Sequence, residues 1–382
     1  MLILQEVHNM SIILNEKYGG LAVMTKILAM YLPQYHVIPE NNEWWGEGFT
    51  EWTNVKSAAP LFEGHYQPRI PANENYYDLS NPETMAKQML LAKHYGIDGF
   101  CIYHYWFNGK QLLEKPINML LERENIELPF CFCWANEPWT RTWDGDEGSK
   151  VTLMGQNYGN IEDWQKHYRY LSVFFKRKEY IKVEEKPVLV IYKQEHIDER
   201  KDMLMIWNAM AIEDGFAGIF IINTRRRNVP DSELYGDAFF DFEPFATIRS
   251  ALPSELEMAT NSYIGNREDN AGMVYGVYDY ERICQYMVRR NVINDKHYLG
   301  MCSWWDNSAR RGMNSPLLFE NADPNVFKQY FKIQYHRAVK ANHEFMFINA
   351  WNEWGEGTYL EPDERFGLGY LEAIKAVREH DE

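Results

Sequence analysis

Eight short apolar runs recur along this chain, and segments with the periodicity of amphipathic helices separate most of them. The runs are apolar at nearly every position, as strands buried on both faces require, so parallel strands covered by helices are favoured over an open antiparallel sheet. The pattern predicts an α/β fold of the (β/α)8 TIM-barrel type. We expect strands at residues 26–32, 99–104, 130–134, 188–192, 218–223, 238–242, 298–304 and 344–350. We expect helices at residues 82–95, 112–124, 161–178, 198–214, 278–291, 324–342 and 368–378.

A doubly wound α/β sheet is the alternative fold. Such a sheet ordinarily binds its ligand through a glycine-rich turn after the first strand, and here Pro33-Gln34-Tyr35-His36 occupies that position. We therefore assign residues 24–382 to a single barrel domain, because no linker of low complexity divides them. Residues 1–23 precede the first strand, contain no usable export signal, and are interpreted as an extension that is not part of the fold.

The composition excludes several classes of partner. A formal net charge of -16 disfavours nucleic acid and anionic membranes, and no apolar run reaches the length of a membrane span. The five cysteines are odd in number and mostly lie in apolar runs, as expected of reduced core residues in a cytoplasmic protein. Cys131 and Cys133 have no second pair to complete a zinc site, so we expect no metal and no cofactor.

The segment from Phe347 to Thr358 carries the strongest chemical signal, because it places Glu353 and Glu356 three residues apart just after an apolar strand. Cleavage of a glycosidic bond requires a proton for the leaving oxygen and a base or nucleophile on the other side, and two carboxyl groups can divide these roles. Trp351 and Trp354 add flat faces on which sugar rings stack. We therefore interpret Glu353 and Glu356 as the catalytic pair.

Polar and aromatic residues collect where the expected strands end, which is the edge at which barrel enzymes form their active sites. Glu137 after the third strand is an alternative to one member of the catalytic pair. The insertion at residues 39–75 is interpreted as a flap over the substrate, since long loops in compact domains are usually functional. The candidate substrate-binding residues are Tyr31, Gln34, Tyr35, Trp45, His104, Tyr105, Trp106, Trp134, Asn136, Glu137, Tyr192, Trp304, Asp306, Asn352 and Trp354.

Several long motifs resemble the glycoside hydrolase family 99-like proteins of the WbsX type, and the resemblance covers residues 26–375. Members of this group are found with bacterial surface-polysaccharide genes, and some carry a glycosyltransferase label, so the resemblance leaves hydrolysis and transfer open. The motifs are Tyr31-Leu-Pro-Gln-Tyr-His36, Trp44-Trp-Gly-Glu-Gly-Phe-Thr-Glu-Trp-Thr-Asn54, Gly96-Ile-Asp-Gly-Phe100, Tyr103-His-Tyr-Trp-Phe107, Trp134-Ala-Asn-Glu137 and Trp304-Trp-Asp-Asn307.

The related endo-α-mannosidases of family 99 also have two glutamates three residues apart on strand eight. By position, Glu353 resembles the base that removes the proton of the sugar 2-hydroxyl, and Glu356 resembles the acid/base that protonates the leaving oxygen. That family retains configuration through a 1,2-anhydro sugar, an exception to the usual two-carboxylate scheme.

The sequence therefore predicts a retaining enzyme, without cofactor, that cleaves an α-glycosidic bond in a bacterial surface polysaccharide or its precursor. Its partner is an oligosaccharide or polysaccharide substrate. Two alternatives remain: a glycosyltransferase of O-antigen or capsule biosynthesis, and a non-catalytic glycan-binding barrel.

Overall fold

The computed structural model describes residues 24–140, 151–226, 234–250, 266–268, 274–312 and 316–379, so the expected extension at 1–23 lies outside the described residues. The strands that form the barrel are β1 (Lys26–Tyr31), β2 (Gly99–Phe107), β4 (Phe130–Trp134), β8 (Lys186–Ile191), β9 (Phe220–Arg225), β10 (Ala238–Asp241), β13 (His297–Tyr298), β14 (Gly300–Cys302) and β16 (Phe345–Asn349). The larger helices are α4 (Pro82–His94), α5 (Lys115–Glu122), α6 (Ile161–Phe175), α7 (Arg200–Glu213), α10 (Tyr280–Arg289), α12 (Pro324–Lys340) and α13 (Gly369–Glu379).

These nine strands form a nearly closed parallel barrel, which confirms the expected fold class. Their order is β13-β10-β9-β8-β4-β2-β1-β16-β14, and every pairing along it is parallel. β13 and β14 lie at opposite ends of this order, yet Leu299 alone separates them in the chain. The segment from His297 to Cys302 thus pairs first with β10 and then with β16, and brings the two ends of the sheet together.

The barrel approaches closure most tightly at Gly300. A Cβ atom at this position would overlap the main-chain carbonyl oxygen of Asp241 in β10. Because only glycine leaves the space for two backbones to approach in this way, Gly300 permits the contact between the ends of the sheet. The single strand expected at 298–304 is therefore interrupted, whereas the other seven expected strands are found within a few residues of their expected bounds.

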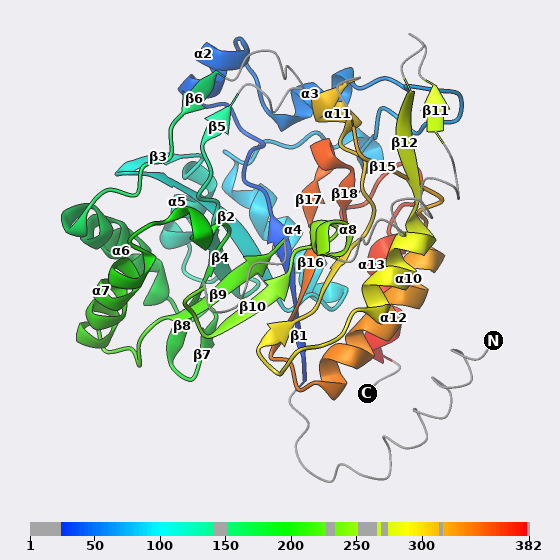
Figure 1. The fold of residues 1–382 in the computed structure, drawn as a ribbon. Helices are drawn as coiled ribbons and strands as arrows, with labels where there is room; N and C mark the ends of the chain where they lie inside the picture. The colour runs from blue at the N-terminus through cyan, green and yellow to red at the C-terminus, as the bar shows by residue number, and fades with distance from the viewer. Residues whose placement is uncertain are drawn as a thin grey trace.

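The helices form an outer layer around the barrel strands, with α6 and α7 on one side and α10 and α12 on another (Figure 1). Two helix starts follow from their sequences: Asn81 accepts a hydrogen bond from Glu83 N before α4, and Asp323 accepts from Asn325 N and Val326 N before α12. In both cases proline occupies the first turn, where its missing N–H costs nothing. All seven expected helices are present in the structure.

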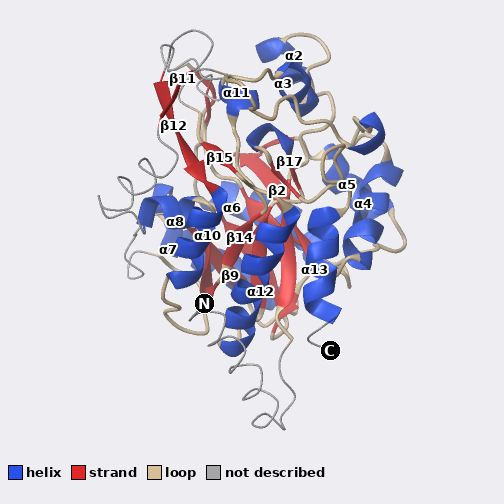
Figure 2. Cartoon of the chain, turned by 90° about the vertical axis from the view of Figure 1, so that its right-hand side faces the viewer, coloured by secondary structure: helices blue, strands red, loops and turns tan. Residues whose placement is uncertain are grey.

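The insertion after β1 differs from the structureless flap that its length suggests, because it contains the helices α2 (Pro39–Trp45) and α3 (Glu51–Ser57) and the 3-10 turn η1 (Ala72–Glu74). Figures 1 and 2 show α2 and α3 at one end of the barrel, with α3 beside the short helix α11 (Ser308–Arg311). Glu51 and Trp52 are buried there. The insertion is therefore a docked cover over that end of the barrel.

The remaining short elements lie in the connections between barrel strands and helices. They are β3 (Lys110–Leu112), β5 (Trp139–Thr140), β6 (Thr152–Met154), β7 (Lys182–Val183), η3 (Gln194–His196), α8 (Phe245–Ser250), β11 (Asn266–Glu268), β12 (Val274–Asp279), β15 (Leu318–Glu320), β17 (Asn352–Glu353), η5 (Trp354–Glu356) and β18 (Thr358–Tyr359). Within the described residues, no helix is both long and apolar enough to cross a membrane.

Candidate active site

The two glutamates of the strand-eight segment lie on a small hairpin just beyond β16. β17 and β18 pair in antiparallel fashion, and the 3-10 turn η5 joins them. Gly357 ends this turn at φ 62°, a left-handed conformation that favours glycine. Glu353 immediately precedes this turn and Glu356 is its last residue, so a single turn separates the two glutamates.

Asn352 fixes this hairpin to the end of β1. Its Oδ1 accepts a hydrogen bond from Leu32 N at 2.7 Å, and its Nδ2 donates to Leu32 O at 2.9 Å. The hydroxyl of Tyr35 donates to the carbonyl of Asn352. These contacts make Asn352 and Tyr35 supports of the carboxylate pair rather than residues that face a ligand.

Arg310, from the short helix α11, joins three carboxylates at the mouth of the barrel. Its Nη2 lies 2.8 Å from Glu353 Oε2, its Nη1 lies 2.8 Å from Glu356 Oε1, and its Nε lies 2.6 Å from Glu51 Oε1. Arg310, Glu51 and Glu353 are buried, whereas the side chain of Glu356 is 24% exposed. Glu356 is thus the member of the group that solvent or a ligand reaches most easily.

One guanidinium cannot neutralise three carboxylates, so this group favours bound protons. Burial raises the pKa of Glu353 to about 8; the cation of Arg310 opposes this shift, and the charges of Glu356 and Glu51 add to it. Burial also raises the pKa of Glu356, again against the effect of Arg310. Because the two groups interact, they titrate as a pair. Near neutral pH the pair can both hold a proton and accept one, as acid/base catalysis needs.

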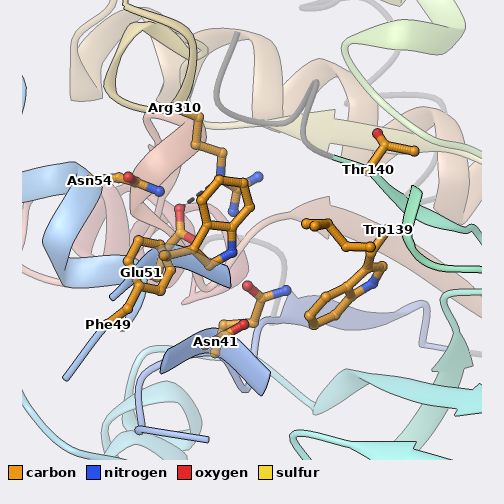
Figure 3. Close-up of a pocket in the computed structure, with 10 residues that line it drawn as sticks. Asn41, Phe49, Glu51, Asn54, Trp139, Thr140 and Arg310 are labelled. Atoms are coloured by element: carbon orange, nitrogen blue, oxygen red, sulfur yellow. Dashed lines mark hydrogen bonds and ion pairs between the residues drawn. The ribbon is translucent and has the colours of Figure 1, made fainter. Parts of the chain in front are cut away.

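A pocket opens beside Arg310 and Glu51, between the insertion and the loop after β4 (Figure 3). Trp45 and Phe49 come from the insertion, and Trp139 faces them from β5. Gln34, Asn41 and Asn54 add neutral amide groups to the wall. Aromatic faces together with a few hydrogen-bonding groups are typical of small-molecule sites, and they suit a sugar ring. The full lining is Gln34, Asn41, Trp45, Phe49, Glu51, Asn54, Trp139, Thr140, Leu153 and Arg310.

Several residues expected from the sequence lie at this site. Gln34 and Trp45 line the pocket. Gln34 Nε2 donates to the hydroxyl of Tyr105 at 3.1 Å, and the ring of Tyr105 meets Trp139 edge-on at 5.3 Å. Tyr192 directly follows β8, and its burial together with the charge of Glu356 raises its pKa. The guanidinium of Arg226 lies 4.1 Å from the centre of the Tyr192 ring.

Three expected binding residues lie on the outer face of the barrel instead. His104 Nε2 is 2.9 Å from His167 Nε2 on α6, Trp106 stacks on the His167 ring at 4.5 Å, and Trp134 meets that ring edge-on at 4.7 Å. Burial lowers the pKa of His104 to about 3, so this imidazole is neutral. These side chains pack the α6 helix against the sheet and do not reach the mouth.

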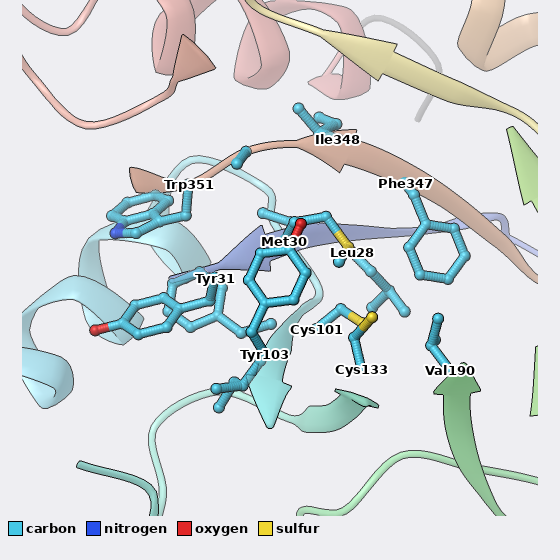
Figure 4. Packing of buried hydrophobic residues seen from close by; sticks show 14 of the residues in the cluster. Leu28, Met30, Tyr31, Cys101, Tyr103, Cys133, Val190, Phe347, Ile348 and Trp351 are labelled. Atoms are coloured by element: carbon cyan, nitrogen blue, oxygen red, sulfur yellow. The ribbon is translucent and has the colours of Figure 1, made fainter. Parts of the chain in front are cut away.

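His104 and Trp106 face α6 because successive side chains of a strand point to opposite faces. In β2, Cys101 and Tyr103 point into the barrel beside Cys133 of β4 (Figure 4). Tyr105 shares their face, whereas His104 and Trp106 point the other way. Tyr103 lies within electrostatic range of Glu353. It therefore belongs to the site, and the sequence interpretation chose its neighbour.

Other expected binding residues are structural anchors. Asp306 accepts hydrogen bonds from His65 at 3.0 Å and Gln67 at 2.8 Å, and Trp304 Nε1 donates to Phe319 O. Hydrogen bonds and the nearby Arg69 cation lower the pKa of Asp306 despite its burial. Asp306 thus holds the insertion to the strand-seven loop, and Arg69 of the insertion lies over the Trp304 ring at 4.0 Å.

The tryptophans beside the glutamates are anchors too. Trp351 and Trp354 are buried, and their indole N–H groups donate to the two oxygens of Glu361 at 3.1 and 2.7 Å. Tyr31 donates to Gln88, which donates in turn to Glu361. These rings offer no free face to a sugar, so the expected stacking on Trp351 and Trp354 is not found.

Asn136 and Glu137 connect the loops after β4 and β8. Asn136 Oδ1 accepts from Lys193 N at 2.7 Å, and its Nδ2 donates to Lys193 O at 2.7 Å. Glu137 forms an ion pair with Lys193. Glu137 is thus paired with a cation outside the Arg310 group, which weakens its case as an alternative catalyst.

Arg310 and Glu51 are members of this group that sequence reasoning missed. Glu51 stood inside the motif that runs from Trp44 to Asn54, and Arg310 follows the Trp304-Trp-Asp-Asn307 motif by three residues. Glu51 and Arg310 are 259 positions apart in the chain. No local spacing marks them as partners.

Comparison with known proteins gives one family. A family model described as Glycosyltransferase WbsX matches residues 27–374. Two relatives, both named Uncharacterized protein WxcX and both from strains of Xanthomonas campestris pv. campestris, are 35% identical over 353 residues. The matched region covers 91% of this chain, and the chain spans 49% of the length of these relatives.

Solved structures share the fold. The endo-α-mannosidase of glycoside hydrolase family 99 from Bacteroides thetaiotaomicron superposes with a TM-score of 0.55 at 13% identity, over 93% of this chain and 96% of that one. A structure described as a glycoside hydrolase-like protein gives a TM-score of 0.57 at 12% identity, over 92% and 93% of the two chains. At such low identity the likeness shows a common fold alone.

Proposed function

Because the chain belongs to the WbsX glycosyltransferase family, we propose that it is a carbohydrate-active enzyme that cleaves an α-glycosidic bond in a bacterial surface polysaccharide or its precursor, with retention of configuration. Glu353 and Glu356 are its catalytic pair. The observation that carries this proposal is the buried Arg310 group, in which both glutamates share one guanidinium at the mouth of the barrel next to an aromatic pocket. Barrel enzymes place their chemistry at this end of the strands.

The roles of the two glutamates follow from their surroundings and from the resemblance to family 99. Glu353, in its ionised form, removes the proton of the sugar 2-hydroxyl, and the resulting oxygen attacks the anomeric carbon. Glu356 gives its proton to the leaving oxygen as the glycosidic bond breaks. Water then opens the anhydro ring: ionised Glu356 takes its proton, and Glu353 returns the first proton to the 2-oxygen. Two inversions at the anomeric carbon give net retention.

Burial favours a bound proton in the pair, and Arg310 stabilises the charge on the glutamate that is ionised. With a pKa of about 8, Glu353 holds a proton in the free protein near neutral pH, so the scheme requires Glu353 to lose this proton, and Glu356 to carry one, before the 2-hydroxyl is attacked. Glu356 is more exposed than Glu353, as a residue that serves both a leaving group and an entering water should be. The anhydro route also requires a 2-hydroxyl trans to the leaving group, which α-mannosides and α-rhamnosides have and α-glucosides lack.

The substrate is an oligosaccharide or polysaccharide, and the pocket beside Arg310 is a place where one of its rings binds. Trp45 and Trp139 line the pocket with aromatic side chains, and Gln34 supplies an amide. The five cysteines are buried and free, which suits a reducing compartment such as the bacterial cytoplasm. We therefore place the enzyme in the cytoplasm, in O-antigen or capsule assembly.

A glycosyltransferase is the second candidate, favoured by the description of the family itself. The same acid/base pair could serve a transfer in which a sugar hydroxyl replaces water. A non-catalytic glycan-binding barrel is a third candidate. It is disfavoured by the buried, proton-sharing glutamates, because pKa values of this kind cluster at catalytic sites.

One experiment separates the three candidates. The protein is incubated with a panel of α-manno- and α-rhamno-configured oligosaccharides, with and without nucleotide sugars, and the products are followed by mass spectrometry and proton NMR. Hydrolysis predicts new reducing ends of retained configuration without a nucleotide sugar, and their loss in Glu356→Gln. Turnover that requires a nucleotide sugar supports the transferase, and binding without any turnover supports the glycan-binding barrel.

A further inference from the structure

The Arg310 guanidinium is held along all three of its edges. Its Nε side is taken by Glu51, and its two terminal nitrogens are divided between Glu353 and Glu356. A guanidinium that meets a carboxylate usually forms a bidentate pair with it, through two parallel N–H···O bonds. Arg310 instead places one terminal nitrogen against each strand-eight glutamate. A fixed contact at Nε would hold it in this orientation.

Glu51 is placed to do this, because its helix is fixed to the barrel. Glu51 N donates to Gln34 O at 3.2 Å, and the neighbouring Trp52 Nε1 donates to Tyr77 O at 2.8 Å. The Trp52 ring packs on Tyr35 at 4.6 Å and on Trp354 at 5.6 Å. The Glu51 carboxylate is thus a rigid point against which Arg310 is oriented.

Gly355, between the two catalytic glutamates, makes room for this contact. A Cβ atom at Gly355 would overlap the Glu51 carboxylate and lie 2.8 Å from Arg310 Nε. Even alanine would push Glu51 and Arg310 away from the hairpin. The glycine of the Glu-Trp-Gly-Glu segment therefore leaves room for Glu51 of the insertion, and the two glutamates serve the proposed chemistry.

We propose that Glu51 is a positioning residue for the carboxylate pair: it holds Arg310 through Nε, so that the guanidinium divides its terminal nitrogens between Glu353 and Glu356. This inference rests on the proposed function for the catalytic role of the pair. The insertion then does more than cover the substrate, because it sets how the two glutamates share their protons.

Within the part of the chain that the structure describes, the pair has the following charged and titratable neighbours. Glu353 faces Arg310 of α11, Glu356 of η5 and Glu51 of α3, together with the hydroxyls of Tyr35, Tyr103 and Tyr105. Glu356 faces Arg310, Glu353 and Glu51, together with Tyr192 just after β8 and Tyr103 of β2. Cys133 of β4 faces Tyr103 and Tyr105. Burial raises the pKa of each of these tyrosines, so they are uncharged at neutral pH. Glu51 is therefore a carboxylate outside the pair whose negative charge acts on both glutamates.

The test is a carbon-13 NMR titration of glutamate side-chain carboxyls in the full chain, with signals assigned from Glu353→Gln and Glu356→Gln. Glu51→Gln keeps an oxygen that accepts a hydrogen bond from Arg310 Nε. It removes the negative charge that raises the pKa of both glutamates in the wild type. Their titration midpoints should fall by about one pH unit or more, as expected for removal of a nearby like charge. Glu43→Gln, an exposed carboxylate of the same insertion, is the charge-matched control and should change neither midpoint.

Gly355→Ala is the second variant. It keeps every charge but displaces the Glu51–Arg310 pair, so it should move the two midpoints apart as the guanidinium favours one glutamate. Midpoints in Glu51→Gln that match those of Glu43→Gln would overturn the proposal. Unchanged midpoints in Gly355→Ala would do the same, and this variant decides the question should Glu51→Gln fail to fold. No substrate is needed, so a failure here is distinct from a failure to find turnover.

Discussion

Replacing Glu353 with glutamine should remove a large pH dependence from the stability of this protein. Burial raises the pKa of Glu353 to about 8, against an ordinary value of 4.5. The folded state therefore binds this proton more tightly than the unfolded state does. Its stabilising effect is fully present below pH 4.5 and is lost as pH rises toward 8.

The magnitude follows from the same values. A tenfold change in proton affinity is worth about 1.4 kcal/mol, so a pKa of about 8 in place of 4.5 corresponds to roughly 5 kcal/mol at most. That is a large share of the 5–15 kcal/mol typical of a whole domain. Glu361 and Glu243, whose pKa values burial raises to about 7, add slopes of the same sign. They are present in both proteins and cancel in the comparison.

The assay is urea denaturation of the wild type and of Glu353→Gln between pH 5 and pH 8.5, followed by circular dichroism. The free energy of unfolding of the wild type should fall relative to that of the variant by several kcal/mol across this range. Glu43→Gln, which alters an exposed carboxylate, should run parallel to the wild type. Parallel curves for wild type and Glu353→Gln would refute the reasoning, since Glu353 would then be ionised as easily in the folded protein as in water.

Three further outcomes are expected. Glu353→Gln and Glu356→Gln should each lose at least about a hundredfold in turnover, because loss of a general acid or base typically costs that much. Both variants should keep the wild-type circular dichroism spectrum. Wild-type turnover by Glu356→Gln on a substrate with a poor leaving group would exclude the acid role of Glu356. Trp139→Ala removes one aromatic wall of the pocket and should weaken oligosaccharide binding, measured by calorimetry, by up to about tenfold, the range for one aromatic contact. Unchanged affinity would show that the substrate does not bind in this pocket. His104→Ala should lower the free energy of unfolding by about 1–3 kcal/mol, because His167 loses its buried partner. Turnover per folded molecule should stay unchanged in the same kinetic assay. A selective loss of turnover would show that His104 takes part in the reaction.

The barrel could be predicted from the sequence because its strands are buried on both faces. Runs such as Phe130–Trp134 are apolar at every position and are bounded by polar connections, so their location is clear. The same property hides which face each residue occupies. In β2 all nine residues are buried, so no contrast between polar and apolar positions tells Tyr103 from His104. The sequence interpretation therefore named His104 and Trp106, which face α6, and left out Tyr103, which faces the barrel interior.

The proximity of Glu353 and Glu356 could be predicted because its signal is local. The two glutamates are three residues apart and follow a clear strand, and they lie on one short hairpin. Arg310 could not be predicted, because its position depends on the strand-seven loop and on the docked insertion. Trp354 shows the opposite error, since a tryptophan beside a glutamate fits a sugar platform as well as it fits a buried anchor for Glu361.

The anhydro-sugar route is tested most directly with one pair of substrates. An α-manno- or α-rhamno-configured oligosaccharide that the wild type cleaves is compared with the same compound carrying a 2-O-methyl or 2-deoxy group at the scissile sugar. Glu353 would have no proton to remove from either analogue, so both should bind and neither should be cleaved. Efficient cleavage of the 2-deoxy compound would contradict the account, because it would require a side chain that attacks the anomeric carbon directly.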